Sequence, residues 1–259
     1  MTTPRIRLVT RGDDAGSCHS ANRAILEACD KGILRNASVM VPGPAFEAAA
    51  AMFADTGICL GLHVTLNAEW ETVKWGPVLP VEQVPSLVDE HGHFFNSPRA
   101  LHERNPDVDQ MVAEVQAQLE RARQYGLPVS YLDEHMGVGR LPGLRERLAA
   151  LAQREGLVDA HPIPSLPHVA DAPGDQVDKW IARLAHAAPG TYVLVTHPGY
   201  DEDDMRQLWH SPQKPGEVAR ERDGERRAWL DPRLKQACLD NEVEIVRYTD
   251  VLTVAQHAA

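Results

Sequence analysis

Short apolar runs recur along the chain, separated by longer segments in which apolar residues return at helical spacing. The runs, typical of buried strands, lie at 6–10, 38–41, 58–66, 129–133, 157–158, 192–196 and 243–246. The clearest helical segment begins at Asn105 and Pro106, a polar cap followed by proline at the first helical position, and ends at Gly126. Strand and helix therefore alternate about seven times.

This alternation favours a largely parallel sheet covered by helices. We predict an irregular (β/α) barrel, TIM-barrel-like, with about seven mostly parallel strands, in a single domain over residues 1–259. A doubly wound open sheet is the alternative. However, the sequence has no GxGxxG or Walker-type glycine loop to mark a nucleotide crevice.

Two segments interrupt the alternation. Residues 67–104 are rich in Pro, Trp, His and Glu, and residues 200–230 are strongly charged. Neither segment has a sustained hydrophobic period. We therefore expect both to be long loops on the active face of the barrel.

The net charge of the chain limits the kinds of molecule that the protein is expected to bind. The formal net charge of -11 argues against nucleic acid or an anionic membrane, since phosphate binding needs a clustered basic surface. One group of basic residues exists, but acids interrupt it, so we predict a solvated mixed-charge face there. Its members are Arg220, Arg222, Arg226 and Arg227.

The N-terminal apolar run is far too short for a signal peptide, and no later stretch approaches the length of a membrane span. A cytoplasmic location is therefore expected. The four cysteines show no CxxC pairing, which suits a reducing compartment better than a disulfide framework or a thiolate zinc site.

Four polar clusters stand at the ends of strand-like runs: Asp13-Asp14, His63, Asp133-Glu134-His135 and Thr196-His197-Pro198-Gly199. In a (β/α) barrel the catalytic side chains sit at the C-terminal ends of the strands. Taken singly, each cluster has an ordinary explanation as a turn, a core histidine or a solvated strand end. Four of them at strand ends together indicate an active site.

One aspartate and two histidines are ligands that a catalytic divalent metal uses while one coordination position stays open. A second carboxylate and a further imidazole then remain for proton transfer. Beside His135, we predict that Asp133 accepts the second N–H of the metal-bound imidazole and so fixes its tautomer. The chain is interpreted as a metal-dependent hydrolase.

Side chains in the two predicted loops are weaker candidates. Sugar rings stack on exposed aromatic rings, so Trp70, Trp75 and Trp209 are candidate substrate-binding residues, and packing of the loops onto the barrel is the alternative. The acidic run 201–204 is expected to be a solvated loop.

The motifs, in their order along the chain, resemble those of the YdjC-like (ChbG-type) carbohydrate deacetylases. The resemblance spans nearly the whole chain. It lies in Gly-Asp-Asp-Ala-Gly at 12–16, Gly-Leu-His-Val-Thr-Leu at 61–66, Leu-Asp-Glu-His at 132–135 and His-Pro-Gly at 197–199.

The resemblance implies a distorted (β/α) barrel that removes acetyl groups from N-acetylated sugars with one divalent metal. It implies that Asp14, His63 and His135 are the metal ligands. It also implies that Asp13 is the catalytic base and His197 the catalytic acid. A homodimer is the oligomeric state that it suggests. The chain departs from the family pattern at Arg11-Gly12, at Ala15, and at Gly137, where the family has an additional histidine.

Zinc is the expected metal, because Asp/His/His with an open position is a familiar catalytic zinc set. Magnesium prefers oxygen ligands, but ligand type alone leaves magnesium, cobalt and nickel as alternatives. Two other functions stay open: a catalytically inactive sugar-binding or regulatory relative, and a non-haem iron oxygenase, which also uses two His and one carboxylate.

Overall fold

The structure, a computed structural model, describes residues 6–170 and 172–252. Its centre is one curled sheet in which all paired strands are parallel. The strands are β1 (Ile6–Ala15), β2 (Asn36–Val39), β3 (Cys59–Val64), β4 (Val129–Glu134), β5 (Val158–Asp159), β6 (Gly190–Thr196) and β7 (Val243–Val246). Their order is β5-β4-β3-β2-β1-β6, with β7 also on β1.

The sheet curls nearly into a ring. β7 pairs with the first half of β1 and β2 with its second half, while β6 takes the opposite edge. On the far side, residues 164–166 approach β6, where Val193 donates its N–H to the Pro164 carbonyl and Leu166 donates to the Val193 carbonyl. The predicted irregular (β/α) barrel is confirmed.

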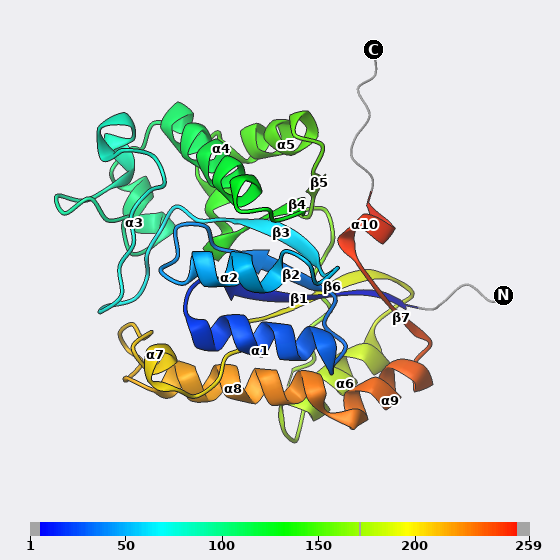
Figure 1. The fold of residues 1–259 in the computed structure, drawn as a ribbon. Helices are drawn as coiled ribbons and strands as arrows, with labels where there is room; N and C mark the ends of the chain where they lie inside the picture. The colour runs from blue at the N-terminus through cyan, green and yellow to red at the C-terminus, as the bar shows by residue number, and fades with distance from the viewer. Residues whose placement is uncertain (1–5, 171, 253–259) are drawn as a thin grey trace, which may run out of the picture.

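Helices cover the outside of the sheet, with α4 and α5 on one side and α1, α8 and α9 on the other (Figure 1). Outward residues such as Ile6 and Leu8 of β1 belong to the main core, whereas Val9 lies in a second cluster inside the barrel, with Tyr131 and Tyr248. The helices are α1 (His19–Asp30), α2 (Phe46–Phe53), α3 (Pro98–His102), α4 (Val108–Gln124), α5 (Leu144–Arg154), α6 (Gln176–His186), α7 (Asp203–Arg206), α8 (Glu217–Leu230), α9 (Pro232–Asp240) and α10 (Tyr248–Val251).

The first insertion, residues 67–104, is largely irregular, as expected. It contains α3 and the short 3₁₀ helices η1 (Val81–Gln83) and η2 (Pro85–Leu87). The Glu114 side chain of α4 accepts hydrogen bonds from the backbone N–H groups of Val78 and Leu79, at 2.9 and 3.0 Å. A buried carboxylate thus fastens this insertion to the barrel, since a buried charge needs such partners.

The second insertion is not a loop throughout, and that prediction was wrong for residues 203–206 and 217–230, which form α7 and α8. The buried positions of α8 do follow a helical period, but Arg222 stands among them between Val218 and Trp229. A charged residue inside the apolar stripe concealed the helix from the hydrophobic pattern.

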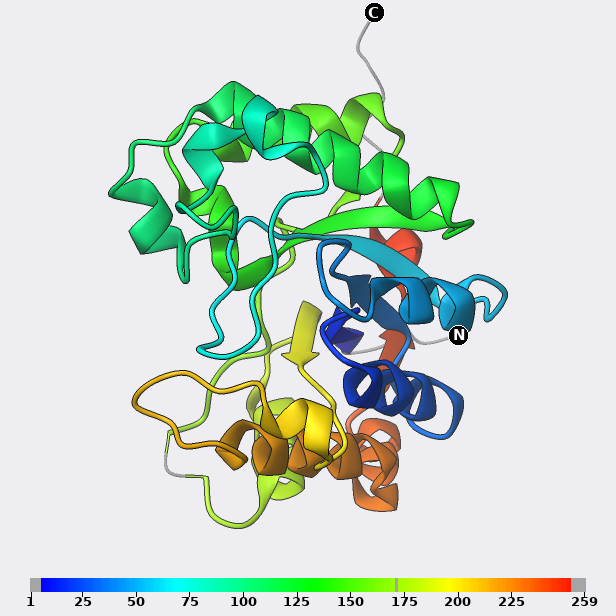
Figure 2. The ribbon, with the colours of Figure 1, turned by 60° about the vertical axis from the view of Figure 1, so that its left-hand side comes forward.

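The two insertions contact each other at the open face of the barrel, which Figure 2 turns toward the viewer. Glu71 donates its N–H to the Trp209 carbonyl at 2.9 Å, and the Thr72 hydroxyl donates to the Gln207 carbonyl at 2.7 Å. The acidic run beside them is only partly solvated, because Asp204 accepts the Ser20 N–H at the start of α1. An acid there is favoured by the helix dipole.

The first polar cluster belongs to β1 itself, because the strand continues to Ala15 rather than ending at Thr10. Its pairing with β2 shifts register between Gly12 and Ala15, and Asp14 has a left-handed φ of 66°. Because of this irregularity, the side chains of the two adjacent aspartates do not simply alternate between the two faces of the sheet.

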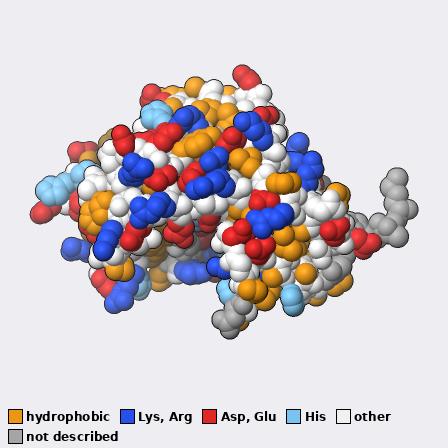
Figure 3. Space-filling model, turned by 90° about the horizontal axis from the view of Figure 1, so that it is seen from below, with side chains coloured by type: hydrophobic (Ala, Val, Ile, Leu, Met, Phe, Trp, Pro, Cys, Tyr) orange, Lys and Arg blue, Asp and Glu red, His pale blue; other side chains and the backbone are white. Residues whose placement is uncertain are grey.

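Basic and acidic side chains are interspersed on the face that Figure 3 shows. No helix within residues 6–170 and 172–252 is long and apolar enough to cross a membrane.

Candidate metal centre

Three side chains from three strand ends meet at one point. Asp14 comes from β1, His63 from β3, and His135 follows β4 at the start of η3 (His135–Arg140). The distances are 3.5 Å from Asp14 Oδ1 to His63 Nε2, 3.3 Å from Asp14 Oδ1 to His135 Nδ1, and 3.3 Å between the two ring nitrogens. All three residues are at most 4% exposed.

This spacing fits a divalent ion. A tetrahedral ion with ligands at about 2.0–2.1 Å places neighbouring ligand atoms about 3.3–3.4 Å apart. Asp14 Oδ1 is buried without a hydrogen-bond partner, a costly state for a carboxylate oxygen unless a cation or a proton satisfies it. The donor set and its geometry therefore suit zinc, and the three predicted ligands do converge.

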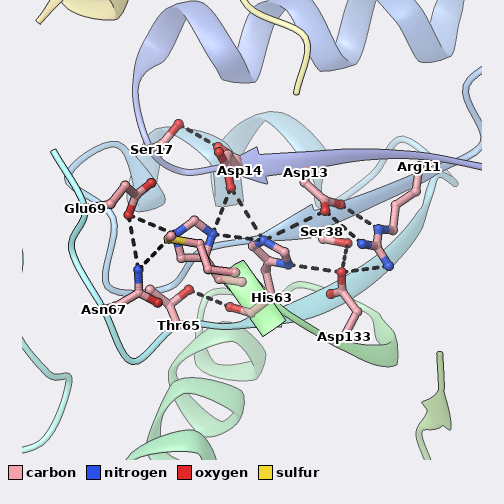
Figure 4. Close-up of polar contacts among 12 residues, drawn as sticks. Arg11, Asp13, Asp14, Ser17, Ser38, His63, Thr65, Asn67, Glu69 and Asp133 are labelled. Carbon is pink, nitrogen blue, oxygen red and sulfur yellow. Dashed lines mark hydrogen bonds and ion pairs between the residues drawn. The ribbon is translucent and has the colours of Figure 1, made fainter. Parts of the chain in front are cut away.

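Each histidine ring contacts a carboxylate through the nitrogen that faces away from the other two ligands, as Figure 4 shows for His63. His63 Nδ1 lies 3.0 Å from Asp133 Oδ2, and His135 Nε2 lies 2.9 Å from Glu69 Oε2. Asp133 thus contacts the ring of His63, so the prediction that it orients His135 was wrong. Both contacts leave the facing ring nitrogens available to a metal.

Glu69 was missed at the sequence level because it lies in the irregular insertion. Asn67, two residues before it, donates to the Met136 sulfur and to the Glu69 carboxylate. This segment lies near the strand ends only when the insertion is folded. The sequence did contain one local signal for Glu69, namely an acidic residue a few positions after the strand that carries His63.

The centre carries excess negative charge. Burial alone would lower the pKa of both imidazoles, but neighbouring acids raise the pKa of His63 well above its usual value and that of His135 to about 9. The four carboxylates around the rings outnumber the two guanidiniums by two, an excess that protonated imidazoles balance in the metal-free protein and that a divalent cation can balance in their place. These groups are Asp13, Asp14, Glu69, Asp133, Arg11 and Arg222.

Asp13 lies beside the triad, with Oδ2 4.0 Å from His63 Nε2. Arg11 holds both of its oxygens, from Nε at 2.6 Å and from Nη2 at 2.8 Å, and also reaches Asp133 at 3.0 Å. Burial would raise the pKa of Asp13, but the Arg11 guanidinium, together with the imidazoles of His63 and His197, lowers it. Arg11, at which the chain departs from the family pattern, is therefore part of this site.

His197, at the end of β6, lines the same pocket as Asp13 and the triad. Its backbone N–H donates to Glu225 Oε2 of α8 at 2.7 Å. Burial raises the pKa of Glu225, and the nearby His197 opposes that rise. The Gly199 N–H donates to the Arg222 carbonyl at 3.2 Å, so α8 fixes the turn that carries His197.

Arg222 corrects the prediction of a solvated mixed-charge face. It is 7% exposed, its Nη2 lies 2.7 Å from Asp14 Oδ2, and its guanidinium packs over Trp70 at 5.3 Å. Burial would raise the pKa of Asp14, but Arg222 contributes most to holding it well below its usual range. The opposite oxygen of Asp14 remains directed at the histidines.

The three tryptophan candidates differ in position. Trp70 lines the metal pocket but is 4% exposed and stacks on His210, with ring centroids 5.6 Å apart. Trp75 is equally buried and donates its Nε1–H to the Asn67 carbonyl, and Trp209 is not among the residues that line the metal pocket. His210, rather than a tryptophan, is the half-buried ring at this wall.

Comparison with known proteins places the chain in a family. The YdjC-like protein family matches residues 7–240, and the chain belongs to it. The carbohydrate deacetylase of Thermoanaerobacter pseudethanolicus is 26% identical over 93% of this chain and 98% of its own length. That of Geobacillus stearothermophilus is 30% identical, over 74% of this chain and 79% of its own.

A solved structure from Enterococcus faecalis V583, named for cellobiose-phosphate cleavage, has the same fold. It matches with a TM-score of 0.78 at 17% identity, covering 95% of this chain and 99% of that one.

Proposed function

We propose that the protein is a metal-dependent carbohydrate N-deacetylase, which hydrolyses the acetamide of an N-acetylated sugar and releases acetate. The observation that carries this is the convergence of Asp14, His63 and His135 at 3.3–3.5 Å, with Asp13 and His197 in the same pocket. Relatives that match over most of their length are named carbohydrate deacetylases, which supports the same reaction.

Asp14, His63 and His135 would hold the metal, with zinc as the first choice. When bound, the ion supplies a Lewis acid that polarises the acetamide carbonyl and makes water more acidic. Asp133 and Glu69 fix the ring orientations behind the two histidines. Arg222 keeps one oxygen of Asp14 turned away from the metal position, so Asp14 acts there through a single oxygen.

Asp13 is the proposed base. Its lowered pKa keeps it ionised at neutral pH, and each oxygen retains a second lone pair beyond its contact with Arg11. It can therefore take a proton from the attacking water while Arg11 holds the carboxylate in place. Water adds to the acetamide carbon, and the C–N bond then breaks.

His197 is the proposed acid, which donates a proton to the departing sugar amine so that acetate and a free amino sugar result. The bond from its backbone N–H to Glu225 fixes the position of the turn that carries the ring. General acid-base catalysis typically contributes about 10²–10⁴-fold in rate.

The test measures acetate release from a panel of N-acetylated sugars by the zinc-loaded protein and by three variants. Asp14→Ala should lose both zinc and activity. Asp13→Asn should keep zinc and lose about 10²-fold or more in kcat. Asp203→Asn, an exposed aspartate of α7, is the matched control and should change neither quantity.

Full activity in Asp14→Ala or Asp13→Asn would overturn the role given to that residue. Zinc and sugar binding without any acetate release would point to the inactive sugar-binding alternative. Turnover that requires iron and oxygen would point to the oxygenase.

A further inference from the structure

Arg11 lies on β1 with its guanidinium between two carboxylates, as Figure 4 shows. Its Nε and Nη2 donate to the two oxygens of Asp13 at 2.6 and 2.8 Å, and its Nη1 lies 3.0 Å from Asp133 Oδ2. Nη1 also donates to the Tyr248 hydroxyl at 2.9 Å. The Arg11 side chain is 11% exposed, so water screens little of the charge of the two acids. One guanidinium therefore serves as the cation for a set of oxygen ligands.

The same acids have the spacing of a metal site. Among the residues that the structure describes, two groups of potential metal ligands share His63: one is the triad, and the other adds Asp13 and Asp133. In the second group the ligand atoms all lie within 4.8 Å of one another. Oxygen ligands at about 2.0–2.6 Å from a hard divalent ion lie about 4.0–5.2 Å apart when they are opposite each other. Without the guanidinium, these acids would be close enough to share an ion.

Such an ion would have oxygen ligands, because His63 is already engaged on both sides. Its Nε2 faces the triad, and its Nδ1 lies 3.0 Å from Asp133 Oδ2. Asp133 Oδ1 is buried without a hydrogen-bond partner, so this acid has a further oxygen to offer. Carboxylate, hydroxyl and water oxygens suit magnesium, calcium and manganese. The second position therefore differs in its ligand chemistry from the proposed zinc triad.

An ion could reach this position without passing the triad. A cavity of about 640 Å³, lined by residues of β4 and β6, reaches Arg11 and Asp133, whereas Arg11 does not line the metal pocket. Burial is therefore not what keeps an ion out. The guanidinium does so, because it occupies the oxygens and its positive charge repels a second cation.

We propose that Arg11 takes the place of a second cation, so that the strand ends hold one divalent ion and Asp13 stays free to act as the base. This inference rests on the proposed metal-dependent function. Arg11 is a positioning residue that acts through Asp13. An oxygen of Asp13 bound to a divalent ion would be a poorer proton acceptor than one held by hydrogen bonds. Because residue 11 departs from the family pattern, this arrangement is a feature of this chain.

The experiment titrates Mn²⁺ into the zinc-loaded protein and follows the free ion by electron paramagnetic resonance. Mn²⁺ is the probe because it suits carboxylate ligands, while zinc occupies the triad. Arg11→Ala should bind one Mn²⁺ per chain at least tenfold more tightly than the wild type does. Arg11→Lys keeps a positive charge and should behave like the wild type. The matched control is Arg7→Ala on the same strand, because Arg7 is 36% exposed and pairs with Glu244 at the surface.

Two further measurements identify the ligand and its consequence. Arg11→Ala combined with Asp13→Asn should keep zinc and lose the Mn²⁺ site. Added Mn²⁺ should lower kcat for acetate release by Arg11→Ala at least fivefold with little change in KM, and should leave the wild type unaffected. If Arg11→Ala does not fold, Arg11→Gln replaces it under the same expectations, because glutamine keeps hydrogen-bond donors without the charge.

The same Mn²⁺ binding in the wild type and in Arg11→Ala would overturn the role of Arg11, and so would Mn²⁺ binding that persists with Asp13→Asn. In either case the deacetylase proposal stands. A wild-type protein that takes up no zinc and releases no acetate from any sugar of the panel would overturn both.

Discussion

Arg222 offers a sharp test of the charge balance at the metal centre, through the substitution Arg222→Met. Asp14 is 1% exposed, and its Oδ2 lies 2.7 Å from the guanidinium. Removing one partner of a buried ion pair costs about 3–5 kcal/mol, because the remaining charge is left buried without compensation. At about 2–4 °C per kcal/mol, the Tm of the metal-free protein should fall by roughly 6–20 °C.

Zinc should reduce this loss. In the variant the cation compensates the charge of Asp14 that Arg222 no longer balances, so bound zinc should stabilise Arg222→Met more than it stabilises the wild type. The assay is urea unfolding of both proteins in a chelator and again in saturating zinc.

The control is Arg227→Met on the same helix, whose guanidinium side chain is 67% exposed and pairs with Asp223. A surface pair of this kind contributes about 0–1 kcal/mol. A loss below about 1 kcal/mol in Arg222→Met without metal, or a loss that grows when zinc is added, would refute the reasoning.

Two further predictions concern other carboxylates of the protein. Asp133→Asn and Glu69→Gln each remove the carboxylate behind a proposed zinc ligand, so each should weaken zinc affinity about 10–100-fold in a competition titration; unchanged affinity would contradict this. The Tyr200 hydroxyl bond, with help from Arg226, lowers the pKa of Glu27 to about 2. Because the folded pKa is depressed, Glu27 stabilises the fold above its unfolded pKa of about 4.3, and this contribution is lost as pH falls toward 2. In urea unfolding, the difference between wild type and Glu27→Gln should therefore be largest near pH 7 and vanish near pH 2, and a difference that grows on acidification would count against it.

The barrel and the strand-end clusters could be predicted from the sequence because they depend on local periodicity. Apolar runs such as Cys59–Val64 are fixed by burial on both faces of the sheet, and parallel strands bring their carboxyl ends to one side. His63 faced the interior because its neighbours Leu62 and Val64 pack in the outer core. These are properties of single segments.

The supporting contacts could not be predicted in the same way, because they depend on partners far away in the chain. Arg222 meets Asp14 across 208 positions, and Glu69 meets His135 from an insertion without periodicity. Because Arg222 carries a charge, the sequence alone predicts that its side chain is exposed to solvent. Including it with Val218 and Trp229, at spacings of four and seven, would have indicated the buried stripe of α8.

The convergence of Asp14, His63 and His135 on one cation is tested most directly by crystals grown with zinc and measured at the zinc absorption edge. The account predicts a single strong anomalous peak, about 2.0–2.2 Å from Asp14 Oδ1, His63 Nε2 and His135 Nδ1. Zinc bound only elsewhere, or no peak among these three side chains, would contradict it.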